Sequence, residues 1–314
     1  MNSNSRHTQA VFRLPRLMGA LGLASTMALT ALASSGAQAQ ASKPAPAQAP
    51  LELKVINHGP ASFHVNSVLV QGEKEALLLD AGFTRADGLR LAAAVLDSGK
   101  TLSTIYVSAA DPDYYFGLEV LHAQFPSARI VTTAQNLKKI EASLPTKLQV
   151  WGPRLGANAP RTPVLPEALS GNTLQLEGRT LEILGLDDAL AHRSHVWIPS
   201  IQAVVGGVSV FGGLHAWTAD TQTAAERATW LAKLDAIAAL HPKTVVPGHM
   251  QPGTALDGSA LAYTRGYLQR FEAELPKAGN SAELISAMKA AYPQAALGMA
   301  LDIGAKVNKG EMKW

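Results

Sequence analysis

The stretch Ser108-Ala-Ala-Asp-Pro-Asp-Tyr-Tyr-Phe-Gly117 stands between an apolar run and an amphipathic segment. The run before it, residues 104–107, is β-branched and aromatic, whereas residues 118–125 carry apolar side chains at helical spacing. This pattern predicts a strand, an acidic loop and a helix. Two carboxylates, Asp111 and Asp113, lie two positions apart in the loop. Folds place ligands and catalytic groups on loops held by rigid elements, so this loop is the first candidate for a functional site.

Strand and helix patterns alternate on both sides of this loop. Apolar runs bounded by turn residues predict strands on its N-terminal side, over residues 51–56, 63–70 and 76–80, and on its C-terminal side, over residues 173–176, 180–183, 195–198, 203–205, 208–211 and 245–246. Capping patterns predict helices that begin after Thr84 and Thr223, and helical spacing predicts two more over residues 261–275 and 282–291. Because strands occur in both halves and are interleaved with helices, we expect one layered αβ domain.

The N-terminal region has the three parts of a secretory signal peptide. Three arginines within the first 16 residues precede an apolar run, and Ala37 and Ala39 form an Ala-x-Ala site. We therefore expect a Sec-type signal peptide over residues 1–39, cleavage after Ala39, and a periplasmic or secreted protein with no stable membrane anchor. A retained anchor is the alternative, but the apolar run is short and diluted by Gly, Ser and Thr. Residues 40–50 are rich in Pro and Ala, which predicts an extended linker.

Composition limits the chemistry. The chain has no cysteine, so disulfides do not stabilise it, and any zinc site must use His, Asp, Glu or Tyr. The formal net charge is only +3, and no Lys/Arg cluster is dense enough to indicate nucleic-acid binding. We expect a small-molecule substrate or ligand as the partner, whereas the sequence leaves the oligomeric state open.

Four ordered landmarks resemble those of the metallo-β-lactamase superfamily: Asp80-Ala-Gly82, the Ser108–Gly117 loop, Gly206-Gly207 and Pro247-Gly-His249. The segment Phe211-Gly-Gly-Leu-His-Ala-Trp217 is similar to the Phe-Gly-x-x-His-x-Trp segment of periplasmic members. The resemblance implies an αββα sandwich, an α/β fold of four layers with the site at one edge. It also implies one such domain over residues 51–314, with helices at its C-terminal end. Asp80 is expected to organise a loop.

The superfamily's metal loop has the pattern His-x-His-x-Asp-His-x-x-Gly, and this chain departs from it at most ligand positions. The first and last loop histidines are replaced by Ala109 and Tyr114, and the aspartate that usually bridges two metals falls at Gly207. Ala and Gly cannot coordinate, and Tyr is a poor ligand unless its phenol ionises. A two-metal site is therefore not expected.

Three potential ligands remain, Asp111, Asp113 and His249, and they could hold one Zn²⁺, Mn²⁺ or Fe²⁺. Each has an alternative role without a metal. Asp113 could cap the helix that contains Tyr114, Asp111 could be a solvated loop carboxylate, and His249 could be hydrogen-bonded within its loop.

The resemblance also suggests a substrate pocket. We expect Tyr114, His192, His215 and Trp217 to line it, with His192 a candidate for the superfamily's middle histidine. His215 could act as a general base, bind substrate or supply a missing ligand, and together with Asp113 it is the predicted catalytic group. The alternative for His215 is a partly buried side chain packed beside Trp217. Residues 151–156, which contain Gly and Pro, are expected to form a loop in the pocket wall.

Two functions follow from these residues. The first is a hydrolase in which a single metal activates water against an ester, lactone or amide bond. The second is a metal-free pseudoenzyme, a periplasmic module that binds small molecules or acts as a scaffold. A serine nucleophile, at Ser108 or Ser209, is a third hypothesis, although the chain has no Gly-x-Ser-x-Gly elbow.

Overall fold

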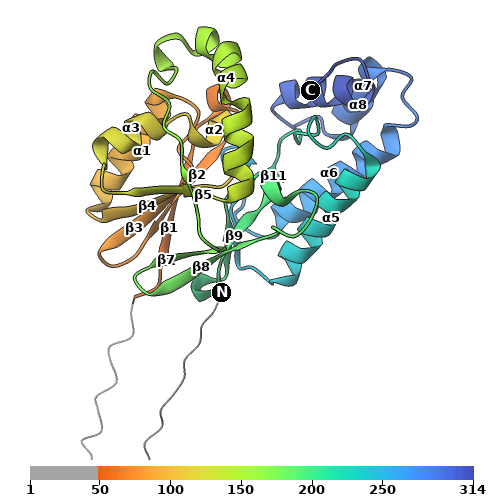
Figure 1. Cartoon of the computed structure of the whole chain (residues 1–314). Helices are drawn as coiled ribbons and strands as arrows, with labels where there is room; N and C mark the ends of the chain where they lie inside the picture. The colour runs from red at the N-terminus through yellow and green to blue at the C-terminus, as the bar shows by residue number, and fades with distance from the viewer. Residues whose placement is uncertain (1–48) are drawn as a thin grey trace, which may run out of the picture. The chain divides into compact units, whose positions relative to one another are not determined.

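The computed structural model describes residues 49–314 (Figure 1). The predicted signal peptide and residues 40–48 of the predicted linker lie outside the described residues. No helix in the described part of the chain is both long and apolar enough to cross a membrane.

Two sheets form the centre of the fold. The first has the strand order β1-β2-β3-β4-β5-β6, with bounds β1 Glu52–Asn57, β2 Asn66–Gln71, β3 Glu75–Leu79, β4 Thr101–Val107, β5 Arg129–Thr132 and β6 Glu167–Ala168. The second has the order β12-β10-β9-β8-β7, with bounds β7 Thr173–Leu176, β8 Arg179–Leu184, β9 His195–Ile198, β10 Ala203–Val205 and β12 Thr244–Val245. A short parallel pair, β11 Phe211–Gly212 and β13 His249–Met250, completes the β structure.

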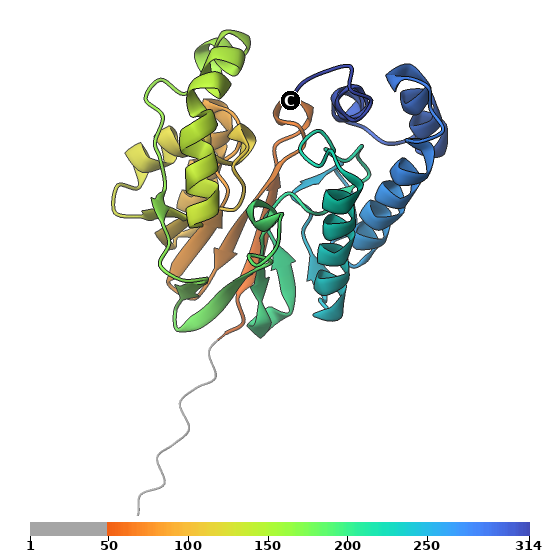
Figure 2. The same ribbon diagram turned by 45° about the vertical axis from the view of Figure 1, so that its right-hand side comes forward.

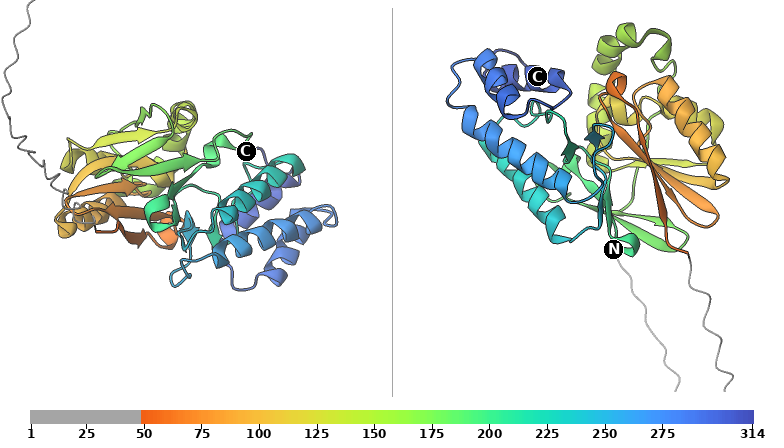
Figure 3. Two further views of the ribbon diagram at one scale, coloured as in Figure 1. Left: turned by 90° about the horizontal axis from the view of Figure 1, so that it is seen from below. Right: turned by 180° about the vertical axis from the view of Figure 1, so that it is seen from behind.

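Helices cover the outer faces of both sheets (Figures 1 and 2). On the first sheet lie α1 Arg85–Ser98, α2 Pro112–Tyr115, α3 Leu118–Gln124 and α4 Ala134–Leu155. On the side of the second lie α5 Ala224–Ala239 and α6 Ser259–Glu274, followed by α7 Ser281–Ala291 and α8 Gly298–Asn308. The view from behind shows the same layers (Figure 3). The fold is therefore the αββα sandwich that the resemblance implies.

Alternation along the strands explains the layers. In β3, Leu77 and Leu79 enter the core between the sheets, whereas Ala76 and Leu78 pack against the outer helices. β3 has apolar residues on both faces because both faces are covered. This is why the sequence shows this strand as a continuous apolar run.

The predicted caps are confirmed, and they fix where two helices begin. Thr84 accepts a hydrogen bond from the Asp87 N–H, and Thr223 does the same for Glu226, so both α1 and α5 begin with a capping box. The predicted helices after residue 260 are confirmed to within two residues. The sequence patterns did not predict α8.

Three local predictions are wrong. The strand expected over residues 63–70 begins only at Asn66, because Phe63 and His64 adopt positive φ angles of 56° and 59° in a turn. The strand expected over residues 208–211 shrinks to β11, which begins at Phe211. Residues 151–155, expected in a loop, belong to α4.

Helix α4 continues through two prolines because of its packing. Pro145 and Pro153 lie inside the helix, where each removes a backbone hydrogen bond. Trp151 offsets this cost, because its ring packs edge-on against Phe63 and Phe83 at centroid distances of 5.4 and 5.3 Å. Tertiary contacts thus override the local helix-breaking pattern.

Candidate functional site

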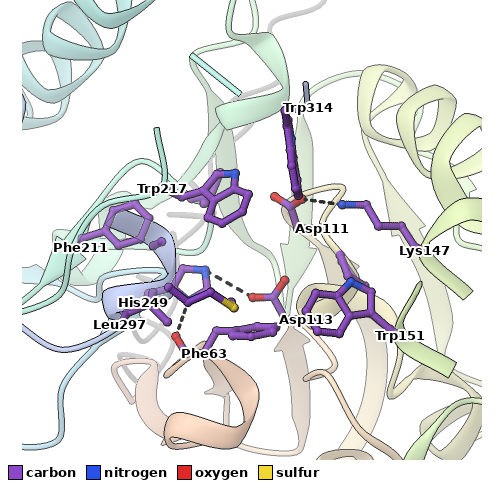
Figure 4. Close-up of a pocket in the computed structure, with 14 residues that line it drawn as sticks. Phe63, Asp111, Asp113, Lys147, Trp151, Phe211, Trp217, His249, Leu297 and Trp314 are labelled. Carbon is purple, nitrogen blue, oxygen red and sulfur yellow. Dashed lines mark hydrogen bonds and ion pairs between the residues drawn. The ribbon is translucent and has the colours of Figure 1, made fainter. Parts of the chain in front are cut away.

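A small cavity lies where the β4–α2 loop meets β13 (Figure 4). Its volume is about 70 Å³. Most of its walls are apolar or aromatic, and its polar lining comes mainly from Asp111, Asp113, Lys147 and His249. The apolar and aromatic lining residues are Phe63, Pro112, Trp151, Val208, Phe211, Trp217, Leu297, Met299, Ala300 and Trp314. The loop singled out in the sequence therefore does reach a cavity.

Asp113 and His249 face each other in this cavity. The Oδ2 atom of Asp113 lies 3.4 Å from Nε2 of His249, and both side chains are buried. The other ring nitrogen of His249, Nδ1, lies 2.9 Å from the Phe63 carbonyl oxygen. A carbonyl oxygen only accepts, so Nδ1 carries a hydrogen and donates it. Nε2 of the neutral ring is then an acceptor, and it faces the Asp113 carboxyl.

Burial shifts the pKa values of both Asp113 and His249. Burial, together with the nearby Asp111 carboxylate, raises the pKa of Asp113 well above its ordinary value. Burial also lowers the pKa of His249 to about 4. Both directions favour the uncharged forms of the two groups, a protonated carboxyl beside the Nε2 acceptor. The cavity thus places one carboxyl–imidazole pair among apolar walls.

Asp111 lines the same cavity but turns to a different partner. Its carboxylate lies 3.8 Å from the Lys147 ammonium group and is about one-third exposed. Asp111 is also the N-cap residue of α2, and its side chain accepts no capping hydrogen bond. Asp113 lies inside the first turn of that helix, so the expectation that Asp113 caps it is wrong.

The three predicted metal ligands line one cavity, but they do not converge on a point. Within residues 49–314, no group of three or more His, Asp or Glu side chains is placed to hold a metal ion. Catalytic zinc sites use about three protein ligands, whereas only Asp113 and His249 come together here. The residues present therefore do not fit a conventional metal centre of this superfamily.

The positions of the lost ligands are filled. Gly207 has a φ of +76°, and a Cβ atom there would lie 2.0 Å from the Ser194 carbonyl oxygen. The Tyr114 phenol is fully buried and donates to the Gly207 carbonyl oxygen at 3.2 Å. Burial raises the pKa of this phenol well above its ordinary value, which disfavours the phenolate that would bind a metal. Ala109 is buried nearby.

The predicted pocket residues fall in different places. Trp217 lines the cavity, and His192 lines the groove next to it. Tyr114 is buried beneath Gly207 and lines neither. His215 also lies outside both, where its Nδ1 is 3.2 Å from the Tyr267 hydroxyl and burial lowers its pKa to about 4. His215 is thus buried and packed against Tyr267, whereas the alternative expected a partly buried side chain beside Trp217; its catalytic role stays a prediction.

Arg193 is a site residue that the sequence analysis did not identify. It is fully buried, and its guanidinium group donates to the carbonyl oxygens of Val208 and Trp217 at 3.1 and 3.0 Å and to Asp220 at 2.5 Å. It also lies 4.0 Å from the centre of the Trp230 ring. Val208 and Trp217 both line the cavity, so Arg193 supports its wall from behind. In the sequence Arg193 stands alone between His192 and His195, and no local pattern indicates that it is buried or supports a cavity wall.

Of the aromatic walls, Trp217 and the segment that begins at Trp151 were expected in the pocket, whereas Phe63 and Trp314 were missed. Phe63, Trp151 and Trp314 come from a turn, from α4 and from the C-terminal segment, and they meet only in three dimensions. The Trp217 and Trp314 rings pack edge-on with their centroids 4.8 Å apart. No spacing in the sequence relates these residues.

Asp80 organises the start of the Ser108–Gly117 loop, as expected. Its carboxylate accepts hydrogen bonds from the Ser108 N–H and from the Ser108 hydroxyl, both at 2.7 Å. The same hydroxyl accepts from the Gly207 N–H at 2.7 Å, which links the loop to the Gly206-Gly207 turn. Ser108 is therefore fully buried in a structural network, which does not support a role as an accessible nucleophile.

We predict that burial of the Asp80 carboxyl makes the unfolding free energy of the protein depend on pH. Burial raises its pKa from 3.8 to about 7, although the Ser108 hydrogen bonds oppose this shift. The folded state then binds more protons than the unfolded state between these values, so this carboxyl loses its stabilising contribution as the pH rises through them. Between about pH 5 and pH 6.5, wild-type unfolding free energy should fall by about 2 kcal/mol relative to Asp80→Asn.

Urea unfolding at a series of pH values checks this expectation. Asp97→Asn, at an exposed position of α1, is the matched control and should follow the wild-type curve. Parallel curves for wild type and Asp80→Asn would contradict the raised pKa of the buried carboxyl.

Comparisons with known proteins agree with the fold and the landmarks. The αββα sandwich with its candidate site at one edge is a hydrolase-like fold. The model of the metallo-beta-lactamase superfamily matches residues 62–249, and this chain belongs to that superfamily. No curated protein matches the sequence significantly.

Three solved structures illustrate the likeness in fold. A metallo-beta-lactamase family protein from Thermus thermophilus is 18% identical, with a TM-score of 0.58 over 83% of this chain and 92% of that one. The B3 metallo-beta-lactamase BLEG-1 is 14% identical, with a TM-score of 0.53 over 69% and 99%. VMB-1 is 18% identical, with a TM-score of 0.51 over 70% and 97%. At these identities the likeness concerns the fold alone.

Proposed function

We propose that this protein binds a small organic molecule in the Asp113–His249 cavity and does not depend on a tightly held metal ion to do so. The observation that carries the proposal is the aromatic cavity in which Asp113 and His249 face each other without a third converging ligand among residues 49–314. The proposal corresponds to the metal-free alternative of the sequence analysis. A periplasmic or secreted location, which rests on the N-terminal sequence, is part of it.

The cavity chemistry limits what can bind. Phe63, Trp151 and Trp217 offer apolar faces, and the neutral pair offers one hydrogen-bonding position. Ligand pockets typically combine such apolar walls with a few polar groups that fix orientation. The part of the ligand that enters the cavity is therefore apolar and carries at most one neutral polar group.

A second candidate is the single-metal hydrolase acting on an ester, lactone or amide bond. One observation favours it: Nδ1 of His249 is anchored on the Phe63 carbonyl oxygen, so Nε2 faces the Asp113 carboxyl. Metal-ligating histidines commonly donate their second nitrogen in this way. The lack of a third converging ligand in the described part of the chain weighs against this candidate.

Binding of a neutral apolar probe tests the first proposal. We expect decanol to change the tryptophan fluorescence of the purified protein in a saturable way, because three tryptophans line the cavity. Trp151→Ala should weaken decanol binding about tenfold, since a buried aromatic contact contributes on the order of 1.5 kcal/mol. Trp197→Phe is the aromatic control outside the cavity and should leave the affinity unchanged.

Metal content separates the two candidates. After chelation and reloading with zinc, manganese or iron, mass spectrometry should find far less than one metal ion per chain. Near-stoichiometric retention that is lost in His249→Ala would overturn the metal-free proposal and favour the hydrolase. Absence of saturable decanol binding would also overturn it, provided that the protein is folded by circular dichroism.

A further inference from the structure

The cavity opens into a larger groove along α4. The groove has a volume of about 730 Å³, against about 70 Å³ for the cavity. Asp111, Lys147, Trp151, Trp217 and Trp314 line both, so the two spaces adjoin each other. Sites for organic ligands commonly enclose roughly 300–1,000 Å³. An organic molecule seated at Asp113 and His249 is therefore too large for the cavity alone and must extend into the groove.

The groove has an excess of positive charge. Lys139, Lys147, Arg154 and Lys313 line it, whereas its carboxylates are Asp111 and Asp220. Asp220 is already paired with the buried Arg193, and Asp111 lies beside Lys147.

Three of these cations lack an acidic partner. Within residues 49–314, no carboxylate lies within ion-pair distance of Lys139, Arg154 or Lys313, whereas other lysines and arginines form ten such pairs. An anion placed in the groove would therefore meet cations that are not already neutralised.

Aromatic rings hold two of the cations at the junction of cavity and groove. The Arg154 guanidinium group lies 5.0 Å from the centre of the Trp151 ring, and the Lys147 ammonium group lies 5.2 Å from that of Trp314. Each ring thus presents an apolar surface to the cavity and supports a positive charge near the groove. Figure 4 shows the Lys147 side chain extending from α4 toward Asp111 at this junction.

Exposed apolar side chains extend the contact surface along the groove. Val150, Met299 and Trp314 line it and are 40%, 40% and 53% exposed. Apolar surface next to unpaired cations suits a ligand that is itself both apolar and negatively charged.

We propose, on the basis of the proposed function, that the ligand is an amphiphilic anion. Its apolar part fills the aromatic cavity, and its carboxylate or phosphate group lies in the groove near Lys139, Lys147, Arg154 and Lys313. The opposite orientation would bring the anionic group against the Asp111 carboxylate in an apolar cavity, which is electrostatically unfavourable. A cationic amphiphile would meet the unpaired cations of the groove.

Ten-carbon probes that differ only in their polar end group test this assignment. At neutral pH and low salt, decanoate and decyl phosphate should bind at least tenfold more tightly than decanol, and decylammonium should bind more weakly than decanol. The advantage of the anions should shrink as salt is added, because salt screens exposed charges. Tighter binding of decanoate than of decyl phosphate would assign a carboxylate, and the reverse order a phosphate.

A charge-matched pair of variants locates the anionic end. Lys139→Gln/Lys313→Gln removes two groove cations and should weaken decanoate about tenfold while leaving decanol unchanged. Lys54→Gln/Lys138→Gln removes the same charge from exposed positions outside the groove and should leave decanoate binding unchanged. Equal weakening by both pairs would overturn the assignment, because it would indicate only the net charge of the protein.

The two proposals fail in different ways. If decanol binds and the anions show no advantage, the ligand is not an amphiphilic anion, and the proposed binding function stands. If none of the probes binds, the proposed binding function fails, and this inference fails with it.

Discussion

Restoring the superfamily's bridging carboxylate by Gly207→Asp is expected to destabilise the protein severely and not to create a metal site. Even the Cβ atom would lie 2.0 Å from the Ser194 carbonyl oxygen, so the backbone must move. The φ of +76° adds strain for any L-residue, about 1–2 kcal/mol. With the overlap included, we expect Gly207→Ala to lower the unfolding free energy by about 3–5 kcal/mol, and Gly207→Asp by at least as much.

The chain offers a matched control for this experiment. Gly178, in the β7–β8 turn, has the same φ of +76°, but a Cβ atom there meets nothing within 4 Å. Gly178→Ala should therefore cost only the backbone strain, about 1–2 kcal/mol. Urea unfolding followed by tryptophan fluorescence compares the two. Equal losses would mean that the turn at Gly207 relaxes and that crowding does not exclude a bridging ligand.

Replacing Arg193 by methionine is expected to cost about 3–5 kcal/mol of unfolding free energy. The substitution leaves the Val208 and Trp217 carbonyl oxygens without their donor and Asp220 without its main cation. Although burial alone would raise the pKa of Asp220, Arg193 and His192 hold it well below its ordinary value. Because Arg193 supports the cavity wall, variants still folded at low temperature should also bind decanol more weakly.

A double-mutant cycle tests this role. Asp220→Asn removes the charge that Arg193 neutralises, so Arg193→Met/Asp220→Asn should lose less than the sum of the single variants. Arg265→Met breaks an exposed pair with Asp235 and should cost less than about 1 kcal/mol. A similar small loss for Arg193→Met would contradict the structural role of the buried cation.

The fold could be predicted from the sequence because its signals are local. Strand alternation, the capping boxes at Thr84 and Thr223, and the four ordered landmarks each depend on residues close together in the chain. Predictions failed where packing overrides a local pattern, as at the two prolines of α4 and the positive-φ turn at Phe63. In both places aromatic contacts outweigh the local preference.

The site could be predicted only in part. The loop and His249 were identified, and Asp113 and His249 do meet. Asp111 was grouped with them because it lies two residues from Asp113, yet its carboxylate faces Lys147. His215 and Trp217 are also two residues apart, and only Trp217 lines the cavity. Proximity in the chain does not determine which partner a side chain reaches.

By itself, the sequence determined the superfamily, the layered architecture and the loss of most metal ligands, because residue identities and short-range patterns carry that information. Only the tertiary structure decided what replaced the metal centre. Phe63 and His249 lie 186 positions apart, and their hydrogen bond fixes the tautomer in which Nε2 of His249 is an acceptor that faces the Asp113 carboxyl. The aromatic walls and the cations of the groove likewise come together only when distant segments pack, so no local pattern encodes them.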